Sequence, residues 1–149
     1  MKKLLVLLLL PLFSFSQTYK DVMSIKSLDT FKKVAIENNY EFDEINDDGL
    51  ILYRLNVTKW MGYNPKDDSF SLIFSKASFF GATDNTEYDR IYAVVKEKCS
   101  YYKIINDKGD DYVCYSCPES SYKGKIGFMI KENWGVINHF PESKSIVED

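Results

Sequence analysis

The sequence predicts an α+β fold, with two helices packed on one face of a twisted antiparallel sheet of about six to seven strands. Apolar residues recur at helical spacing in two segments, and strand-like runs on either side of a Gly-containing turn follow each segment. The chain also has 11 Tyr and 10 Phe, residue types that favour strands. Hairpins form antiparallel sheet, and helices that bury one face must pack on it, so these segments predict one layered domain.

The first predicted helix runs from residue 28 to about residue 39 and has Ser27 or Asp29 as its N-cap. Its apolar residues have the one-face spacing of an amphipathic helix: Leu28, Phe31, Val34 and Ala35. Residues 17–27, which precede it, are interpreted as a short polar lead-in.

The first predicted hairpin consists of residues 40–45 and 50–57 around the turn at 46–49, where an Asp-Gly pair favours a tight reversal. Residues 60–65 are predicted as a loop. Apolar residues then alternate with polar ones over residues 70–74, which predicts a third strand.

The same order of elements is predicted again in the second half. Thr86 and Asp89 have the spacing of a capping box, and a helix follows them to about Lys98. The remaining predicted elements are a hairpin of 100–105 and 111–117 around the turn 106–109, a strand at 126–130, a turn at 132–135 and a strand at 136–140.

The two halves match at a constant offset of 60 positions. The matched pairs include Phe42 and Tyr102, Ile45 and Ile105, Asn46 and Asn106, and Gly49 and Gly109. A tandem αβββ duplication explains the offset. Two unrelated helix–hairpin units with similar turns explain it as well, so both interpretations stay open.

The N-terminal residues have the pattern of an export signal. Lys2 and Lys3 precede an apolar run over residues 4–13, and small residues flank Phe15 just before Gln17. A membrane-spanning helix needs about 20 apolar residues, more than this run provides. We therefore expect cleavage of residues 1–16 and no membrane span in the mature protein.

The expected organisation is a signal peptide at 1–16, a single α+β domain at 17–141 and a polar C-terminal tail at 142–149. The formal net charge of the whole chain is −3, and loss of the leader removes two more lysines. An acidic chain without a basic cluster argues against nucleic acid as a partner. The leader predicts a periplasmic or secreted protein.

The three cysteines are interpreted through the register of the second hairpin. Cys114 and Cys117 form a C-x-x-C motif, but on a strand two positions three apart point to opposite faces. If the turn pairs Asn106 with Asp110, Cys99 lies opposite Cys117. We predict a Cys99–Cys117 disulfide in an oxidising compartment and a free thiol at Cys114. Thiol–disulfide exchange by Cys114 and Cys117 is the alternative.

Signatures of catalysis and of metal binding are weak. His139 is the single histidine, and no G-x-S-x-G, H-E-x-x-H, phosphate loop or dinucleotide motif occurs. The acidic turns at 44–49 and 104–109 lack the ligand pattern of a calcium loop. The sequence therefore predicts no cofactor and no metal site, and it favours a non-enzymatic role, with thiol–disulfide exchange as the enzymatic alternative.

Aromatic residues remain as the candidate binding residues, because Trp and Tyr offer large rigid contact areas. The candidates are Trp60, Tyr63, Tyr122 and Trp134. We expect an exported binding or inhibitor-type module that recognises an unknown protein or peptide through the solvent face of its sheet. A glycan-binding envelope protein is the other alternative.

The tandem helix–hairpin plan resembles that of exported inhibitor or adaptor proteins. Examples are tandem β-lactamase-inhibitor-like domains and the helix–hairpin modules called PepSY. The resemblance is one of architecture and implies a binding role, without assigning function to any residue.

Overall fold

The computed structural model describes residues 17–75, 87–118, 124–131 and 134–142. The predicted leader and residues 143–149 of the predicted tail lie outside these ranges. The described helices are α1 (Tyr19–Ser24), α2 (Leu28–Glu37) and α3 (Glu87–Lys98). The strands are β1 (Glu41–Ile45), β2 (Ile51–Asn56), β3 (Lys59–Asn64), β4 (Ser69–Ser75), β5 (Ser100–Asp107), β6 (Asp110–Ser116), β7 (Lys125–Lys131) and β8 (Trp134–Phe140).

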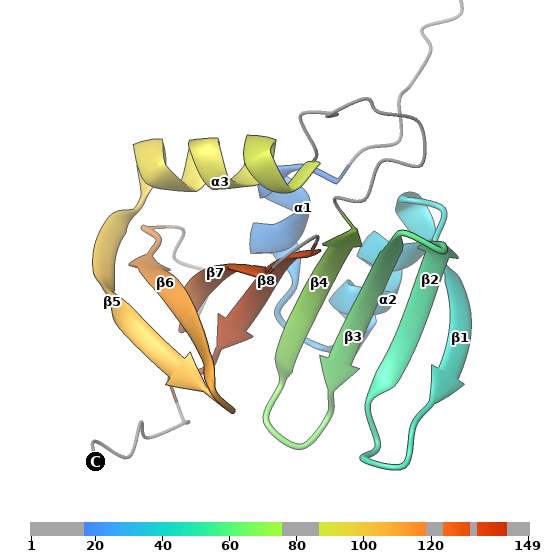
Figure 1. Ribbon diagram of the computed structural model, residues 1–149. Coiled ribbons are helices and arrows are strands. Elements are labelled where there is room, and N and C mark those ends of the chain that lie inside the picture. Colours follow the sequence, from blue (N-terminus) through green and yellow to red (C-terminus); the bar gives the residue numbers. More distant parts are fainter. Residues whose placement is uncertain (1–16, 76–86, 119–123, 132–133, 143–149) are drawn as a thin grey trace, which may run out of the picture.

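The eight strands form one antiparallel sheet in the order β1-β2-β3-β4-β8-β7-β6-β5 (Figure 1). Each half of the sheet is a meander of four strands that follows a helix, and the last strands of the two meanders, β4 and β8, pair at the centre. Leu72 and Ile137 lie opposite each other in the middle of this pair. The repeated order of elements is therefore a feature of the fold, whereas an origin by duplication stays a prediction.

The sheet has eight strands instead of the predicted six to seven, because residues 59–64 form β3 and not a loop. Met61 and Tyr63 are buried on one face of β3, while Trp60 and Gly62 point to the other face. This alternation of buried and exposed residues is typical of a strand. The sequence favoured a loop instead, because Gly62 and the Asn64-Pro65 pair are residue types common in turns.

The fold also has three helices instead of the predicted two. Residues 19–24 form α1, where a polar lead-in was expected. Asp21 and Thr18 form a capping box, and the helix buries Tyr19, Val22 and Met23. Six residues are too few to show helical periodicity clearly, so this helix depends on its cap and on packing.

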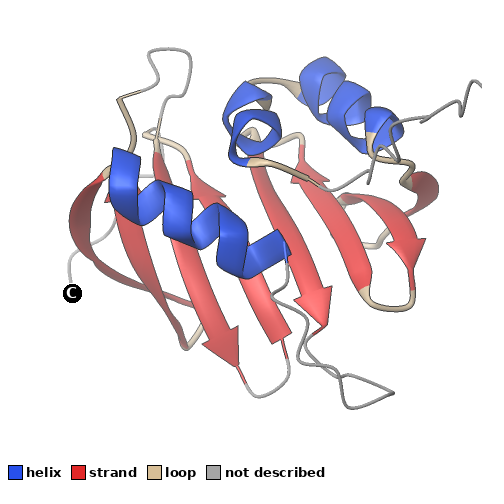
Figure 2. Ribbon diagram, turned by 90° about the horizontal axis from the view of Figure 1, so that it is seen from above, coloured by secondary structure: helices blue, strands red, loops and turns tan. Residues whose placement is uncertain are grey.

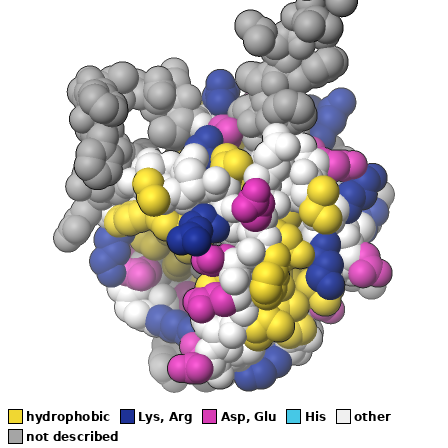
Figure 3. All heavy atoms as spheres, turned by 90° about the vertical axis from the view of Figure 1, so that its right-hand side faces the viewer, with side chains coloured by type: hydrophobic (Ala, Val, Ile, Leu, Met, Phe, Trp, Pro, Cys, Tyr) yellow, Lys and Arg dark blue, Asp and Glu magenta, His cyan; other side chains and the backbone are white. Residues whose placement is uncertain are grey.

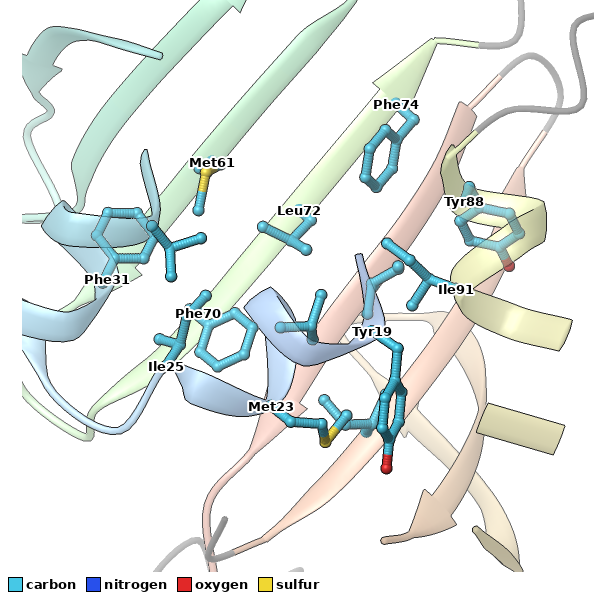
Figure 4. Packing of buried hydrophobic residues seen from close by; sticks show 14 of the residues in the cluster. Tyr19, Met23, Ile25, Phe31, Met61, Phe70, Leu72, Phe74, Tyr88 and Ile91 are labelled. Atoms are coloured by element: carbon cyan, nitrogen blue, oxygen red, sulfur yellow. The ribbon is translucent and has the colours of Figure 1, made fainter. Parts of the chain in front are cut away.

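All three described helices cover the same face of the sheet (Figure 2). The main core lies between them and the strands, where Phe31 of α2 and Tyr88 of α3 point toward the sheet (Figure 4). Fully buried strand residues that complete this core are Met61, Tyr63, Leu72, Phe74, Ile126 and Ile137. The sequence prediction of helices on one face of an antiparallel sheet is confirmed.

Candidate binding face

The face of the sheet opposite α1, α2 and α3 carries no described helix, and we call it the open face (Figure 2). Its side chains come from the alternate positions of each strand. On β3, β4 and β8 they include Trp60, Ile73 and Val136, which lie side by side because Trp60 pairs with Ile73 and Ile73 pairs with Val136. The centre of the open face is thus an apolar row.

Two of the predicted binding residues meet on this row. Trp134 begins β8 and pairs with Ser75 of β4, so its indole lies diagonally across β4 from Trp60. The ring centroids are 5.4 Å apart with an interplanar angle of 48°. The small side chain of Ser75 leaves room for the two rings to meet over β4. We call Trp60 and Trp134 the tryptophan pair.

The tryptophan pair is accessible to solvent. Trp134 is 38 % exposed, and Trp60, Ile73 and Val136 are partly exposed. Large apolar groups that stay in contact with water at the middle of a sheet are unusual, because burial of such groups is favourable. This patch therefore has the composition of a contact surface.

A charged pair borders the tryptophan pair on each side. Arg54 of β2 lies opposite Trp60 and forms an ion pair with Asp43 at 3.0 Å. Lys131 of β7 lies opposite Trp134 and forms an ion pair with Asp110 at 2.7 Å. In both pairs the cation is the more exposed partner, at 50 % against 27 % and 63 % against 30 %. These four charged residues are not recognisable from the sequence alone, because their positions beside the indoles depend on strand register.

The other two predicted aromatic residues do not join this patch. Tyr63 is 1 % exposed, packs against Phe31 and donates a hydrogen bond from its hydroxyl to Asp68 Oδ1 at 2.5 Å. Burial and this acidic neighbour raise the pKa of Tyr63 above its ordinary value. Tyr63 is therefore a core residue on the helix side of the sheet. Tyr122 lies outside the described residues.

Around the C-terminal end of β8, the open face of β5–β8 is closed by its own side chains. Phe140 lies over Gly127, where an added Cβ would come within 2.6 Å of the phenyl ring and 3.0 Å of Cys114 Sγ. Gly127 thus lets the ring reach across β7 to β6. The buried cluster contains Ile105, Tyr112, Cys114, Met129 and Phe140.

The cysteines separate onto the two faces of the sheet. The sulfurs of Cys99 and Cys117 lie at bonding distance, with Cα atoms 4.3 Å apart, and the pair adjoins the main core. Cys114 is a free, fully buried thiol in the cluster under Phe140. Cys114 and Cys117 therefore do not face each other.

Burial raises the pKa of the Cys114 thiol to about 11. The thiolate is the reactive form, so a buried thiol with a raised pKa is a poor nucleophile at neutral pH. This geometry gives no support to thiol–disulfide exchange by Cys114 and Cys117.

His139 is a buried residue on the helix side of the sheet. It is 8 % exposed and packs against Phe70, with ring centroids 5.2 Å apart. Its Nδ1 lies 3.3 Å from the carbonyl oxygen of Asp68. Within the described ranges, no three His, Cys, Asp or Glu side chains gather as metal ligands do.

A buried ion pair joins α3 to β3. Glu87 Oε1 lies 3.0 Å from Lys59 Nζ, and the Glu87 side chain is almost fully buried. Its Oε2 has no hydrogen-bond partner among the described residues. This pair links the first residue of α3 to the sheet. Removal of one member would leave an uncompensated buried charge and would destabilise this contact.

The two edge strands are a second type of exposed surface. Phe42 and Ile45 of β1 are exposed, and Figure 3, which shows the β1 side of the molecule, has hydrophobic side chains interspersed with charged ones. Both edge strands contain a register shift, at Phe42/Glu44 in β1 and at Tyr101/Lys103 in β5. Bulges and charges on edge strands oppose the addition of further strands. The edges are therefore weaker candidates than the tryptophan pair.

Comparisons with protein-family models, with curated proteins and with solved structures found no match. No helix in the part of the chain that the structure describes is long and apolar enough to cross a membrane. A functional assignment for this chain therefore depends on its own geometry.

Proposed function

We propose that the protein is a non-enzymatic binding module that recognises a protein or peptide segment at the tryptophan pair. The supporting observation is the meeting of Trp60 and Trp134 at the centre of the open face, with Ile73 and Val136 beside them. Tryptophan is among the residue types that dominate binding energy at protein interfaces. Charged pairs around an apolar centre form the polar rim typical of such interfaces.

The ring geometry favours a protein ligand over a glycan. The two indoles contact each other at a tilt of 48° and do not form one flat surface. Aromatic rings prefer offset-stacked or edge-to-face contacts, so two indoles tilted against each other can make such contacts with an apolar or aromatic side chain. We therefore infer that the ligand contacts the tryptophan pair through an apolar side chain of a peptide segment.

We also infer that the module works outside the cytoplasm, in the periplasm or after secretion. The leader-like residues at the start of the chain and the cysteine pair at disulfide distance support this inference. Disulfides persist in oxidising compartments and are rare in the cytosol.

Photo-cross-linking in living cells tests the proposal. A benzoylphenylalanine at position 134 should yield an adduct with a partner protein, because the side chain would lie in the interface. The matched control places the same group at Ile36, which is 65 % exposed on α2, on the opposite side of the sheet. Trp60→Ala should abolish the adduct at position 134. Equal adducts at both positions, or none at position 134, would contradict the proposal.

A further inference from the structure

Gln17, the residue expected to begin the mature chain, is buried near a carboxylate that lacks one partner. We propose that cleavage of the leader frees the α-amino group of Gln17 inside the fold, where its ammonium pairs with Oε2 of Glu87. The peptide bond before Gln17 is then a processing site whose cleavage completes a buried ion-pair cluster. This inference goes beyond the proposed binding role and rests on the export signal predicted from the sequence.

The first observation is the way in which Gln17 is held. The residue is 3 % exposed. Its side-chain amide donates a hydrogen bond to Met61 Sδ of β3 at 3.0 Å and accepts one from the Tyr40 hydroxyl at 3.3 Å. The first residues of a domain are usually poorly ordered unless contacts of this kind tie them down. The α-nitrogen that cleavage would free therefore has a defined place over β3.

The second observation is the incomplete pairing of Glu87. Only 6 % of its side chain is exposed, and its Oε1 lies 3.0 Å from Lys59 Nζ. Its Oε2 has no hydrogen-bond partner within the described part of the chain. Buried polar atoms without a partner are rare in folded proteins, because their lost hydration is not replaced. Lys59 is 29 % exposed and occupies one oxygen, so the carboxylate can accept a second cation at the other.

The third observation is that Gln17 and Glu87 share neighbours. Met61, which holds the Gln17 amide, follows Lys59 by two positions on β3, so both side chains lie on the same face, about 7 Å apart along the strand. Burial and, next, the charge of Glu87 raise the pKa of the Tyr40 hydroxyl above its ordinary value, so Tyr40 lies near Glu87 as well. In Figures 1 and 2 the chain that enters α1 lies close to the first turn of α3, which Glu87 begins.

Cleavage changes the charge at this place. In the precursor the α-nitrogen of Gln17 is a neutral amide with one N–H. Hydrolysis adds water across the peptide bond, which leaves a carboxylate on Ser16 and an amine on Gln17. An α-amine has an ordinary pKa of about 7.7–8.0, so at neutral pH it takes up a proton and becomes an ammonium. Hydrogen bonds between charged groups are about twice as strong as neutral ones, so the mature chain gains a stabilising contact that the precursor lacks.

A double-mutant cycle between the N-terminus and Glu87 tests the pairing. One protein begins at Gln17 with a free amine, and its match carries an acetyl group on that nitrogen. We expect acetylation to raise the unfolding equilibrium constant at least about tenfold in urea denaturation, the effect of losing one hydrogen bond between charged groups. The two forms should unfold alike in Glu87→Gln. Glu37→Gln, which removes an exposed carboxylate of α2, should keep the difference.

Amine reactivity is a second measurement, which does not depend on the folding of Glu87→Gln. The Gln17 amine of the folded protein should react with an acylating reagent at neutral pH at least about tenfold more slowly than the amine of the peptide Gln-Thr-Tyr, because burial and pairing hold the ammonium. Unfolding the protein in urea should remove this protection. Equal rates in the folded protein and the peptide would overturn the proposal.

Other outcomes would overturn it as well. These are equal unfolding constants for the free and acetylated proteins, or a difference between them that persists in Glu87→Gln. Intact mass of protein recovered from cells that export it must also match a chain that begins at Gln17 with its amine intact, and a different first residue would contradict the processing site. None of these results affects the tryptophan pair, because cross-linking at position 134 tests that surface independently.

Discussion

The two halves of the sheet share one strand plan but treat the open face differently. In the β5–β8 half, Phe140 crosses Gly127 and seals a buried cluster. At the equivalent end of β4, the last residue is Ser75, and the tryptophan pair lies beside it with part of its surface in water. Both β4 and β8 have seven residues, and their last side chains, Ser75 and Phe140, differ greatly in size.

This contrast shows how a single-layer sheet face becomes either a core or a contact surface. A large residue that lies over a glycine on the next strand buries itself and its neighbours. Two large residues that meet over a serine cover each other only in part. The half with the sealed cluster also contains the cysteine pair at disulfide distance. We therefore expect stability to depend on the β5–β8 half of the open face, and binding on the tryptophan pair.

The largest expected effect comes from removing one aromatic ring from each region, Phe140 from the buried cluster and Trp134 from the tryptophan pair. Phe140→Ala should lower the free energy of unfolding by about 3–5 kcal/mol, because it empties a buried site. Trp134→Ala should cost less, about 1–2 kcal/mol, because 38 % of the residue is already exposed to water. Urea denaturation of both variants gives the comparison, and equal losses would show that the two regions do not differ.

The second effect concerns the cysteine pair. Replacing Cys99 and Cys117 together by serine should cost about 3 kcal/mol in the chain-entropy model, since the closed loop separates them by 18 positions. Thiol counting in denaturant should find one free thiol in the unreduced wild-type protein, from Cys114. Three free thiols, together with a midpoint that reductant leaves unchanged, would mean that the bond does not form.

The third effect compares two glycines on the open face. Gly127→Ala should cost about 1–3 kcal/mol, because its Cβ would clash with Phe140 and with Tyr112 Cβ at 2.9 Å. Gly62→Ala is the control, since its Cβ would meet only the flexible end of Leu52 at 3.2 Å. Thermal unfolding followed by circular dichroism measures both, and a larger loss at Gly62 would reverse the expected order.

The smallest effect is a pH dependence of the sealed cluster. The pKa of Cys114 is about 11 in the fold against an ordinary value of 9.0. The neutral thiol therefore contributes stability that is fully present below pH 9 and is lost as the pH rises toward 11. Between pH 8 and pH 10 the wild type should lose about 1 kcal/mol more than Cys114→Ala. Parallel losses in the two proteins, measured by urea denaturation at each pH, would count against burial of this thiol.

The cysteine register shows both the reach and the limit of sequence reasoning. The prediction paired Asn106 with Asp110, whereas Asn106 pairs with Asp111 because Lys108 and Gly109 alone form the turn, both with positive φ. A one-residue shift between Tyr101 and Lys103 then restores the predicted register at Ser100 and Ser116. Two errors thus cancel, and bulges of this kind leave no clear mark in a single sequence.

The tryptophan pair shows the same limit for the site. Trp60 and Trp134 are recognisable as candidates by residue type, but their meeting depends on the pairing of β4 with β8, two strands that are far apart in the chain. Tyr63 is a candidate by residue type as well, but it is buried. It lies three positions after Trp60 on β3 and therefore points to the opposite face of the sheet. Helix and hairpin order follow from local patterns, whereas the face on which a residue lies follows from strand register.

Acrylamide quenching of the tryptophan emission tests most directly whether the open face is a binding surface. In the free protein, both indoles should be quenched readily. Saturation with the partner protein that cross-links at position 134 should protect them. Emission that resists quenching in the free protein, or that stays equally sensitive when calorimetry shows the partner bound, would contradict a ligand site at the tryptophan pair.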